Sequence, residues 1–178
     1  MISTRSTAAT LATAALVLTG GAATAATKAH RDVAGDAPAA TADITRIVVR
    51  NGDHALSVQT KLAKATATRT HLVITLTPAA EGAATYVVRT VELAHRVGAT
   101  LESTAADATE AAPLDCPGIK ATVSRGRRGQ VLVRVPQACF GADAGTLVAQ
   151  VATQTGTQVE AGTDETTDES AALRVKRG

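Results

Sequence analysis

The chain has almost no aromatic residues: its 178 positions include one tyrosine, one phenylalanine and no tryptophan. Sites that stack sugar rings depend on the large, rigid apolar faces of exposed aromatic side chains. The composition leaves little material for such a platform, because Tyr86 and Phe140 are both expected in the hydrophobic core. The rest of that core must be built from valine, leucine, isoleucine and alanine.

Other side chains that carry chemistry are also scarce. Met1 is the only methionine, and there are two cysteines and four histidines. The histidines lie on separate predicted elements without metal-ligand spacing, and two cysteines are too few for a zinc site. No serine lies in the G-x-S-x-G turn of many hydrolases. The sequence therefore favours a non-catalytic protein that needs no cofactor.

A large excess of charge of one sign is missing as well. The chain has 18 basic and 16 acidic residues, and the N-terminal leader predicted below contains one basic and no acidic residue, so the remaining chain is close to +1. Nucleic acids and anionic membrane surfaces attract proteins through a sustained positive excess. Neither is expected as a partner.

The N-terminal 25 residues have the pattern of a signal peptide. Arg5 gives a short positive region, the apolar stretch Ala8–Leu18 follows, and Ala23-Thr24-Ala25 supplies small residues for cleavage. The apolar stretch is too short for a stable transmembrane helix, and no later segment is long and apolar enough to span a bilayer. We expect cleavage after Ala25 and a secreted, extracellular protein.

The remaining chain shows the period-two alternation of half-buried strands. The clearest case is 54–62, where Leu56, Val58, Thr60 and Leu62 share one face. Asn51-Gly52 precedes it and predicts a tight hairpin, because both residues tolerate positive φ. Alternation or β-branched residues predict the other strands over 44–50, 71–77, 85–91, 97–103, 119–123, 131–135 and 146–153. Residues 171–176 are expected to form either an edge strand or a frayed end.

Eight or nine short antiparallel strands in one domain predict an all-β sandwich. The expected organisation is a signal peptide over 1–25, an N-terminal extended segment over 26–42, and a β-sandwich domain over 43–178. Residues 154–170 are rich in threonine, glycine and acidic residues, and we expect a mobile loop there. A further loop is expected over 105–117.

The two cysteines flank the strongest hairpin signal in the sequence. Cys116 lies just before the strand at 119–123, and Cys139 lies just after the strand at 131–135. The two open ends of a hairpin are adjacent, and paired cysteines in an exported chain are expected to oxidise. A Cys116–Cys139 disulfide is therefore predicted, with a stabilising effect of roughly 3 kcal/mol in the chain-entropy model.

Four short motifs occur along the chain in the order Asp32-Val-Ala-Gly35-Asp36, Asp43-Ile44-Thr45-Arg46, Leu114-Asp115-Cys116 and Val135-Pro136-Gln137-Ala138-Cys139-Phe140-Gly141. This order resembles a group of small secreted bacterial proteins over nearly the whole expected mature chain. More distantly, the first two motifs resemble the sandwich of family 9 carbohydrate-binding modules and DOMON domains, which implies a jelly-roll-like fold and, in some members, sugar, calcium or haem binding. The expected mature chain lacks an aromatic platform for sugars. It also has no methionine, and its histidines match no motif that would supply the methionine or histidine axial ligands of haem.

Two clusters of charge are candidate binding sites. Asp32, Asp36 and Asp43 could bring carboxylate oxygens together around Gly35, and Ca²⁺ prefers such ligands. The alternative is a set of solvated loop acids. A second acidic cluster, at 164–165 and 168–169, is expected to be an exposed loop rather than a metal site.

The turn after residue 124 contains the candidate polyanion site, Arg125, Arg127 and Arg128, flanked by Gly126 and Gly129. A cell-wall polymer could bind these three arginines through charge-assisted hydrogen bonds; the alternative is a well-hydrated turn.

Taken together, the sequence predicts a secreted, non-catalytic β-sandwich with a binding or structural role outside the cell. The alternatives are a calcium-, polyanion- or glycan-binding module of the cell wall, or a hydrolase with an unrecognised carboxylate site.

Overall fold

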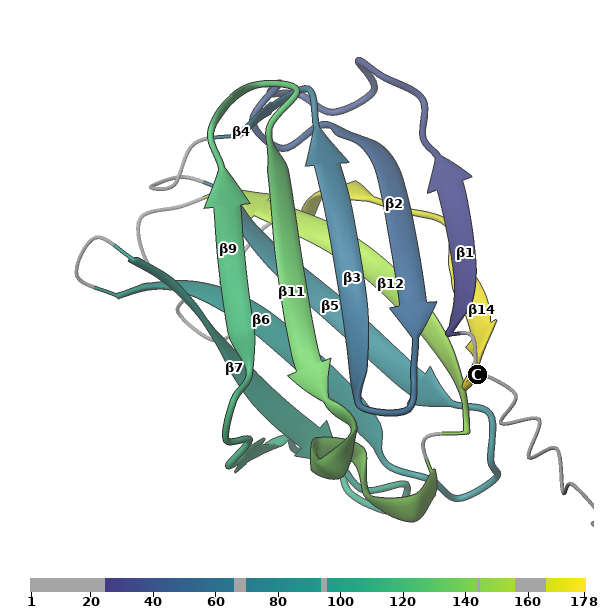
Figure 1. The fold of residues 1–178 in the computed structure, drawn as a ribbon. Coiled ribbons are helices and arrows are strands. Elements are labelled where there is room, and N and C mark those ends of the chain that lie inside the picture. The colour runs from purple at the N-terminus through teal and green to yellow at the C-terminus, as the bar shows by residue number, and fades with distance from the viewer. Residues whose placement is uncertain (1–24, 66–69, 94–95, 144, 156–165) are drawn as a thin grey trace, which may run out of the picture.

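The protein is a two-layer antiparallel β-sandwich with one disulfide, as the sequence predicted (Figure 1). The computed structural model describes residues 25–65, 70–93, 96–143, 145–155 and 166–178. The near layer in Figure 1 is a five-stranded sheet in the order β1-β2-β3-β11-β9. Its strands are β1 (Ala26–Arg31), β2 (Ile44–Asn51), β3 (Ala55–Leu62), β11 (Gln130–Pro136) and β9 (Lys120–Ser124).

The second layer is a seven-stranded sheet in the order β13-β12-β5-β6-β7-β8, with β14 also paired to β12. A two-stranded ribbon of β10 (Gly126–Arg127) and β4 (Lys64–Ala65) lies beside the first sheet, and the 3-10 segment η1 (Gln137–Asp143) follows β11. The strands of the second sheet are β13 (Thr166–Glu169), β12 (Thr146–Thr155), β5 (Thr70–Pro78), β6 (Thr85–Leu93), β7 (Arg96–Thr104), β8 (Ala112–Leu114) and β14 (Leu173–Lys176).

The described residues form 14 strands, more than the eight or nine expected, because short strands extend the sheets where alternation is too brief to detect. Strand β1 lies in the segment expected to be merely extended, and β8 lies in the loop expected over 105–117. Both ends of the segment expected as a loop over 154–170 belong to strands, since β12 continues to Thr155 and β13 covers Thr166–Glu169. Residues 156–165 lie outside the described part of the chain.

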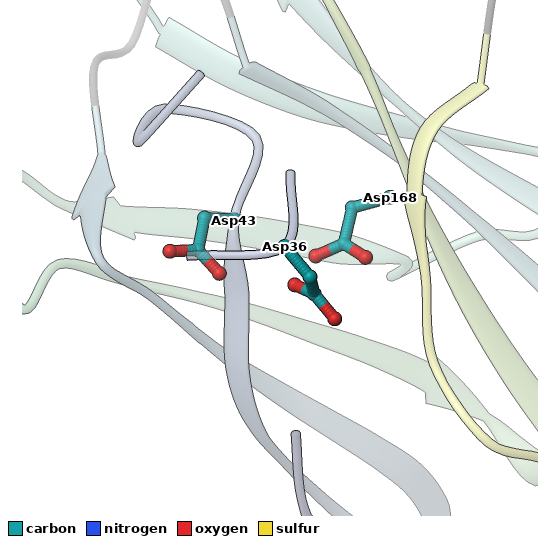
Figure 2. A group of neighbouring side chains, drawn as sticks. All are labelled: Asp36, Asp43 and Asp168. Atoms are coloured by element: carbon teal, nitrogen blue, oxygen red, sulfur yellow. The ribbon is translucent and has the colours of Figure 1, made fainter. Parts of the chain in front are cut away.

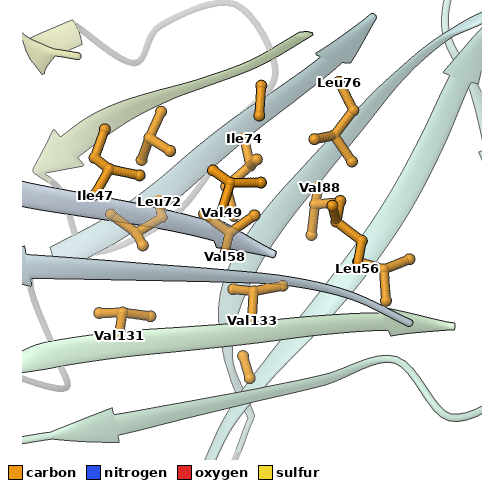
Figure 3. Close-up of a cluster of buried hydrophobic side chains, with 14 of the residues drawn as sticks. Ile47, Val49, Leu56, Val58, Leu72, Ile74, Leu76, Val88, Val131 and Val133 are labelled. Atoms are coloured by element: carbon orange, nitrogen blue, oxygen red, sulfur yellow. The ribbon is translucent and has the colours of Figure 1, made fainter. Parts of the chain in front are cut away.

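The core lies between the two sheets and is built from aliphatic side chains of both (Figure 3). Alternation places one side of each strand inside, so that Leu56 and Val58 of β3 face Ile74 and Leu76 of β5. Phe140 is 1 % exposed, and its ring meets the Tyr86 ring edge-on with centroids 5.2 Å apart. Both aromatic residues therefore contribute to the core, as expected.

The hairpin expected at Asn51-Gly52 forms, but its tip is displaced. Asn51 is still paired with Leu56, and the Gly52 N–H donates to the Ala55 carbonyl at 3.2 Å, so the chain reverses at Asp53-His54. Asn51 is fully buried, and its Oδ1 accepts a 2.6 Å hydrogen bond from Gln137 Nε2. Buried polar side chains need such partners. The hydrogen bond with Gln137 therefore stabilises Asn51 within the strand pairing rather than at the tip of the turn.

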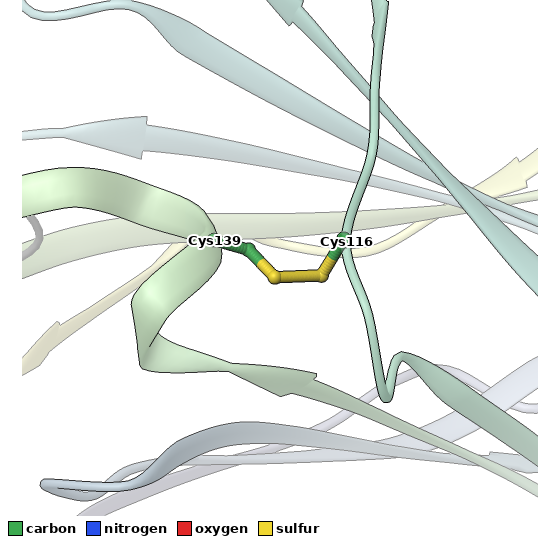
Figure 4. Close-up of a disulfide and its surroundings, with 2 residues drawn as sticks. All are labelled: Cys116 and Cys139. Atoms are coloured by element: carbon green, nitrogen blue, oxygen red, sulfur yellow. A yellow bond between two sulfur atoms is a disulfide. The ribbon is translucent and has the colours of Figure 1, made fainter.

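The disulfide joins Cys116 and Cys139 across the open end of the β9–β11 hairpin (Figure 4). Their Cα atoms are 5.4 Å apart, and no described cysteine is free. The predicted pairing is confirmed. It fastens the loop before β9 to η1, whose Phe140 fills the core beside it.

The signal peptide predicted over 1–25 lies outside the described residues except for Ala25, and β1 begins at the next position. Within the described ranges, no helix has the length and apolar character needed to cross a membrane.

Candidate functional site

Three aspartates from two distant parts of the chain converge at one end of the sandwich (Figure 2). Asp36 lies in the connection between β1 and β2, Asp43 immediately precedes β2, and Asp168 lies in β13 of the other sheet. One carboxylate oxygen from each lies within 4.8 Å of the other two. Figure 2 shows the carboxylate of Asp36 between those of Asp43 and Asp168.

Asp43 is the most enclosed member of this group, with 4 % of its surface exposed. Its Oδ2 accepts a 2.8 Å hydrogen bond from the Gly35 N–H, while its Oδ1 is buried without a hydrogen-bond partner. Gly35 has φ of +90°, a conformation that side-chain-bearing residues rarely adopt. The tight turn at Gly35 thus holds the β1–β2 connection against Asp43, and one carboxylate oxygen remains available to a ligand.

Asp168 joins the two sheets at this point. Its Oδ2 accepts a 2.6 Å hydrogen bond from the Ile44 N–H at the start of β2, and its Oδ1 accepts one of 2.8 Å from the Glu169 N–H. Nearby, the Thr153 hydroxyl donates to the Ala42 carbonyl at 2.7 Å. Because Asp168 is opposite Thr153 in the β12–β13 register, both side chains point toward the first sheet.

The pKa of Asp168 is raised above its ordinary value. Burial is the main cause, and the negative charges of Asp36 and Asp32 raise it further. The hydrogen bonds from the Ile44 and Glu169 N–H groups act in the opposite direction without cancelling the shift. A carboxyl whose charge is disfavoured by burial and by like-charged neighbours gains from a nearby cation.

The structure supports only part of the predicted ligand set. Asp36 and Asp43 lie together as expected, whereas Asp32 lies outside the group and its Oδ1 accepts a hydrogen bond from the Val33 N–H at 3.0 Å. The third carboxylate is Asp168, which the sequence assigned to an exposed acidic loop. That assignment is wrong for Asp168, which is half-buried in β13. Asp164 and Glu165, expected in the same loop, lie outside the described residues.

The donor set suits a hard divalent cation. Three carboxylates offer six oxygens, and an oxygen that accepts one hydrogen bond has a second lone pair for a metal. Ca²⁺ takes six to eight oxygen ligands in flexible geometries, which suits carboxylates from a loop, a strand start and a second sheet. The arrangement can bind a cation, and in doing so it would cross-link the two layers.

The three arginines of the candidate polyanion site lie in the turn between β9 and β11. All three are exposed, and Arg127 belongs to β10 in the small ribbon. The Arg128 N–H donates to the Ala63 carbonyl at 3.1 Å, which fastens the turn to the end of β3. Gly129 is required there, because a Cβ at this position would lie 2.3 Å from the Ala65 Cβ. The turn is an ordered basic tip, and among the described residues none of its arginines forms an ion pair.

No protein-family model matches the chain, and a search of curated proteins returned no significant match. Any functional assignment must therefore come from the geometry of the described residues.

Proposed function

We propose that this chain is an exported, non-catalytic β-sandwich domain that binds calcium through Asp36, Asp43 and Asp168. The observation that carries the proposal is the nearly complete burial of Asp43 beside two other carboxylates, with its Oδ1 unpartnered. A buried carboxylate with an unsatisfied oxygen is costly. A bound cation would offset the repulsion among the three charges, and a cation held by both oxygens of Asp43 would also satisfy Oδ1.

The position of the site supports a structural role for the ion. Asp36 and Asp43 belong to the connection that leads into β2 of the five-stranded sheet, and Asp168 belongs to β13 of the seven-stranded sheet. A cation among them would hold the two layers together opposite the end that the disulfide fastens. The disulfide and the pattern of the N-terminal 25 residues support an extracellular location, where calcium is abundant enough for weak sites.

Calorimetric titration of the mature chain with CaCl₂ tests the proposal. We expect a dissociation constant on the order of 10⁻⁴–10⁻³ M, as in other extracellular modules. Calcium at ten times that constant should stabilise the fold by about 1.4 kcal/mol and raise the thermal midpoint. Mg²⁺ should bind more weakly, because it demands a near-ideal octahedral site.

Asp36→Asn is the most informative variant. Asp36 is exposed and makes no hydrogen bond within the described residues, so the substitution should leave the metal-free fold intact while it removes one negative charge and one carboxylate oxygen from the site. Glu169→Gln is the matched control. It also removes one negative charge, from the exposed position of β13 that follows Asp168 in the sequence. Calcium binding should be clearly weaker in the first variant, because one charge and one oxygen are lost, and unchanged in the second. A flat titration of folded wild-type protein, or equal losses in both variants, would contradict the proposal.

A further inference from the structure

The outer face of the five-stranded sheet has one sign of charge only. The register β1-β2-β3-β11-β9 aligns side chains into three rows that run across the strands. The two outer rows contain six cations, and no strand of this sheet contains an aspartate or glutamate. The cations are Arg31, Arg46 and Lys61 in the first row and Arg50, Arg134 and Lys120 in the third.

Several of these cations are direct cross-strand neighbours. Arg46 is opposite both Arg31 and Lys61, and Arg134 is opposite Lys120. Like charges that face each other across a sheet are destabilising. Within the described residues none of the six forms an ion pair that would relieve this repulsion. The arrangement costs stability, so a role within the isolated domain does not explain it.

Protection of sheet edges does not account for the pattern. Charged residues on edge strands prevent pairing with other chains, and this explains Arg31 on β1 and Lys120 on β9. The remaining four cations lie on β2, β3 and β11, which are paired on both sides. Acidic residues lie beyond the ends of these strands, where Asp53 pairs with Arg177 at 3.7 Å and Asp32 follows β1.

The row between the cations is neutral and partly apolar. It contains Val48, Gln59 and Leu132, and Leu132 is 38 % exposed. A shallow hollow of about 200 Å³ lies there, bordered also by Arg50 and Ser57. The two cationic rows are four residues apart along the strands, or about 13 Å. The amide of Gln59 thus lies between two borders of positive charge, and the Ser57 hydroxyl lies in the third row between Arg50 and Arg134.

From this arrangement we infer that the outer face of the five-stranded sheet binds an anionic polysaccharide. Acidic groups of the polymer meet the two cationic rows through charge-assisted hydrogen bonds. Sugar hydroxyls meet Gln59 and Ser57, and sugar C–H groups meet Val48 and Leu132. Recognition by charge and amide groups needs no aromatic platform, which agrees with the absence of aromatic residues from these five strands.

Two other polyanions fit the same face less well. Single-stranded nucleic acids are bound largely by stacking of bases on aromatic side chains, and no aromatic residue lies in these strands. Proteins that bind the membrane surface insert an apolar face between the lipids, whereas the one exposed large apolar side chain of these strands is Leu132. Both polyanions serve as competing outcomes of the test.

The test measures binding of the full mature chain to polygalacturonate, with neutral dextran, a DNA duplex and phosphatidylserine-containing vesicles as comparison ligands. We expect polygalacturonate to bind most tightly, dextran not to bind, and added salt to weaken binding. Tighter binding of the DNA or of the vesicles, or equal binding of dextran, would overturn the inference.

Variants locate the site. The face variant Arg50→Gln/Lys61→Gln/Arg134→Gln should weaken polygalacturonate binding by about tenfold or more, because three charge-assisted contacts are lost. It should not lower the thermal midpoint, since repulsion is relieved. Two matched controls remove three charges each: Arg125→Gln/Arg127→Gln/Arg128→Gln at the basic tip, and Arg89→Gln/Arg174→Gln/Lys176→Gln on the other sheet. Each control should change the affinity by less than about threefold.

Leu132→Ser tests the neutral row without changing charge. It should weaken binding by a few fold and leave the salt dependence unchanged, because the contact is apolar. Equal losses in the face variant and in either control variant would show that net charge or the basic tip governs binding, and would overturn the inference. So would an unchanged affinity in the face variant.

Discussion

The two sheets of this sandwich share a core but differ in the charge on their strands. The five-stranded sheet contains seven cations and no carboxylate, whereas the strands of the seven-stranded sheet contain four of each. On the second sheet's outer face, Arg89 and Glu102 pair at 3.5 Å, and neutral side chains such as Val73, Thr75 and Val87 surround them. The chain is nearly neutral overall, but the strands of its five-stranded sheet carry an excess of positive charge and those of its seven-stranded sheet do not.

The net charge of the chain does not describe the charge of each sheet surface. A total near zero predicts no attraction to polyanions, but local fields depend on where charges lie and on whether opposite charges accompany them. The inward-facing sides of both sheets are equivalent, because both supply aliphatic residues to one core. Any functional difference between the layers must therefore come from their outward-facing residues.

The largest expected effect concerns the disulfide, which belongs to the basic side of the molecule. Cys116 precedes β9, an edge strand of the five-stranded sheet, and Cys139 follows β11. Replacing both by serine should lower the free energy of unfolding by roughly 2–5 kcal/mol, the usual cost in small secreted domains. Denaturant titration of the variant beside wild-type protein measures this loss.

Hydrogen exchange then distinguishes the two sheets in the same variant. Protection should fall most in β9, which has one neighbouring strand and loses its covalent anchor, and least in β5 and β12 at the centre of the other sheet. Equal loss of protection in both sheets would mean that the sheets open as one unit and that the disulfide stabilises them equally.

Much of the fold was readable from the sequence, because its signals are local. Alternation located the long strands, and the cysteines around the β9–β11 hairpin predicted the disulfide. The short strands β1, β8 and β13 were missed, since six or fewer residues are too few to give a clear alternation. The Asn51-Gly52 signal located the hairpin but not its tip, because Gln137 and Val175 bond to the Asn51 side chain from far along the chain.

Both candidate sites depend on contacts between distant segments. Asp168 reaches Asp43 because β13 pairs with β12, and a Thr-rich acidic stretch gives no sign of that pairing. The basic face depends on β3 lying beside β11, about 70 residues later in the sequence, which aligns Ser57 with Arg134 and Lys61 with Gln130. Alternation identifies such residues as outward-facing, but only the strand order brings them together.

An intermediate effect on stability is expected at Asp168. This residue belongs to the second sheet, and its carboxylate accepts a hydrogen bond from Ile44 of the first sheet. Its pKa in the folded protein is raised, so the folded state holds the proton more tightly than the unfolded state does. In metal-free protein this contribution to stability is present below the ordinary pKa of 3.8 and is lost as pH rises through the raised value. The thermal midpoint of wild-type protein in EDTA should therefore contain a component that falls as pH rises through this range. In Asp168→Asn that pH-dependent component should be smaller.

Calcium should oppose this trend, because the ion binds the deprotonated carboxylate. The gain in thermal midpoint from calcium should therefore be larger at pH 7 than at pH 4. Glu169→Gln is again the control, and it should keep both the pH dependence and the calcium effect. An equal calcium effect at the two pH values would indicate that binding does not involve a carboxyl group with a raised pKa.

The smallest expected effect is at the Arg89–Glu102 ion pair, where the contrast between the two faces can be tested by a single charge. Both side chains are 29 % exposed, so water screens their interaction, and Glu102→Gln should cost only about 0.2–1 kcal/mol of unfolding free energy.

The substitution leaves Arg89 unpaired and raises the net charge by one. It does not create a row of cations, because Val87 and Thr100 are the cross-strand partners of Glu102 and Arg89. Polygalacturonate binding should therefore change by less than about twofold, whereas Arg50→Gln, which alters the net charge by the same amount in the opposite direction, should weaken it more. If Glu102→Gln strengthens binding as much as Arg50→Gln weakens it, total charge rather than its arrangement on the five-stranded sheet controls the interaction.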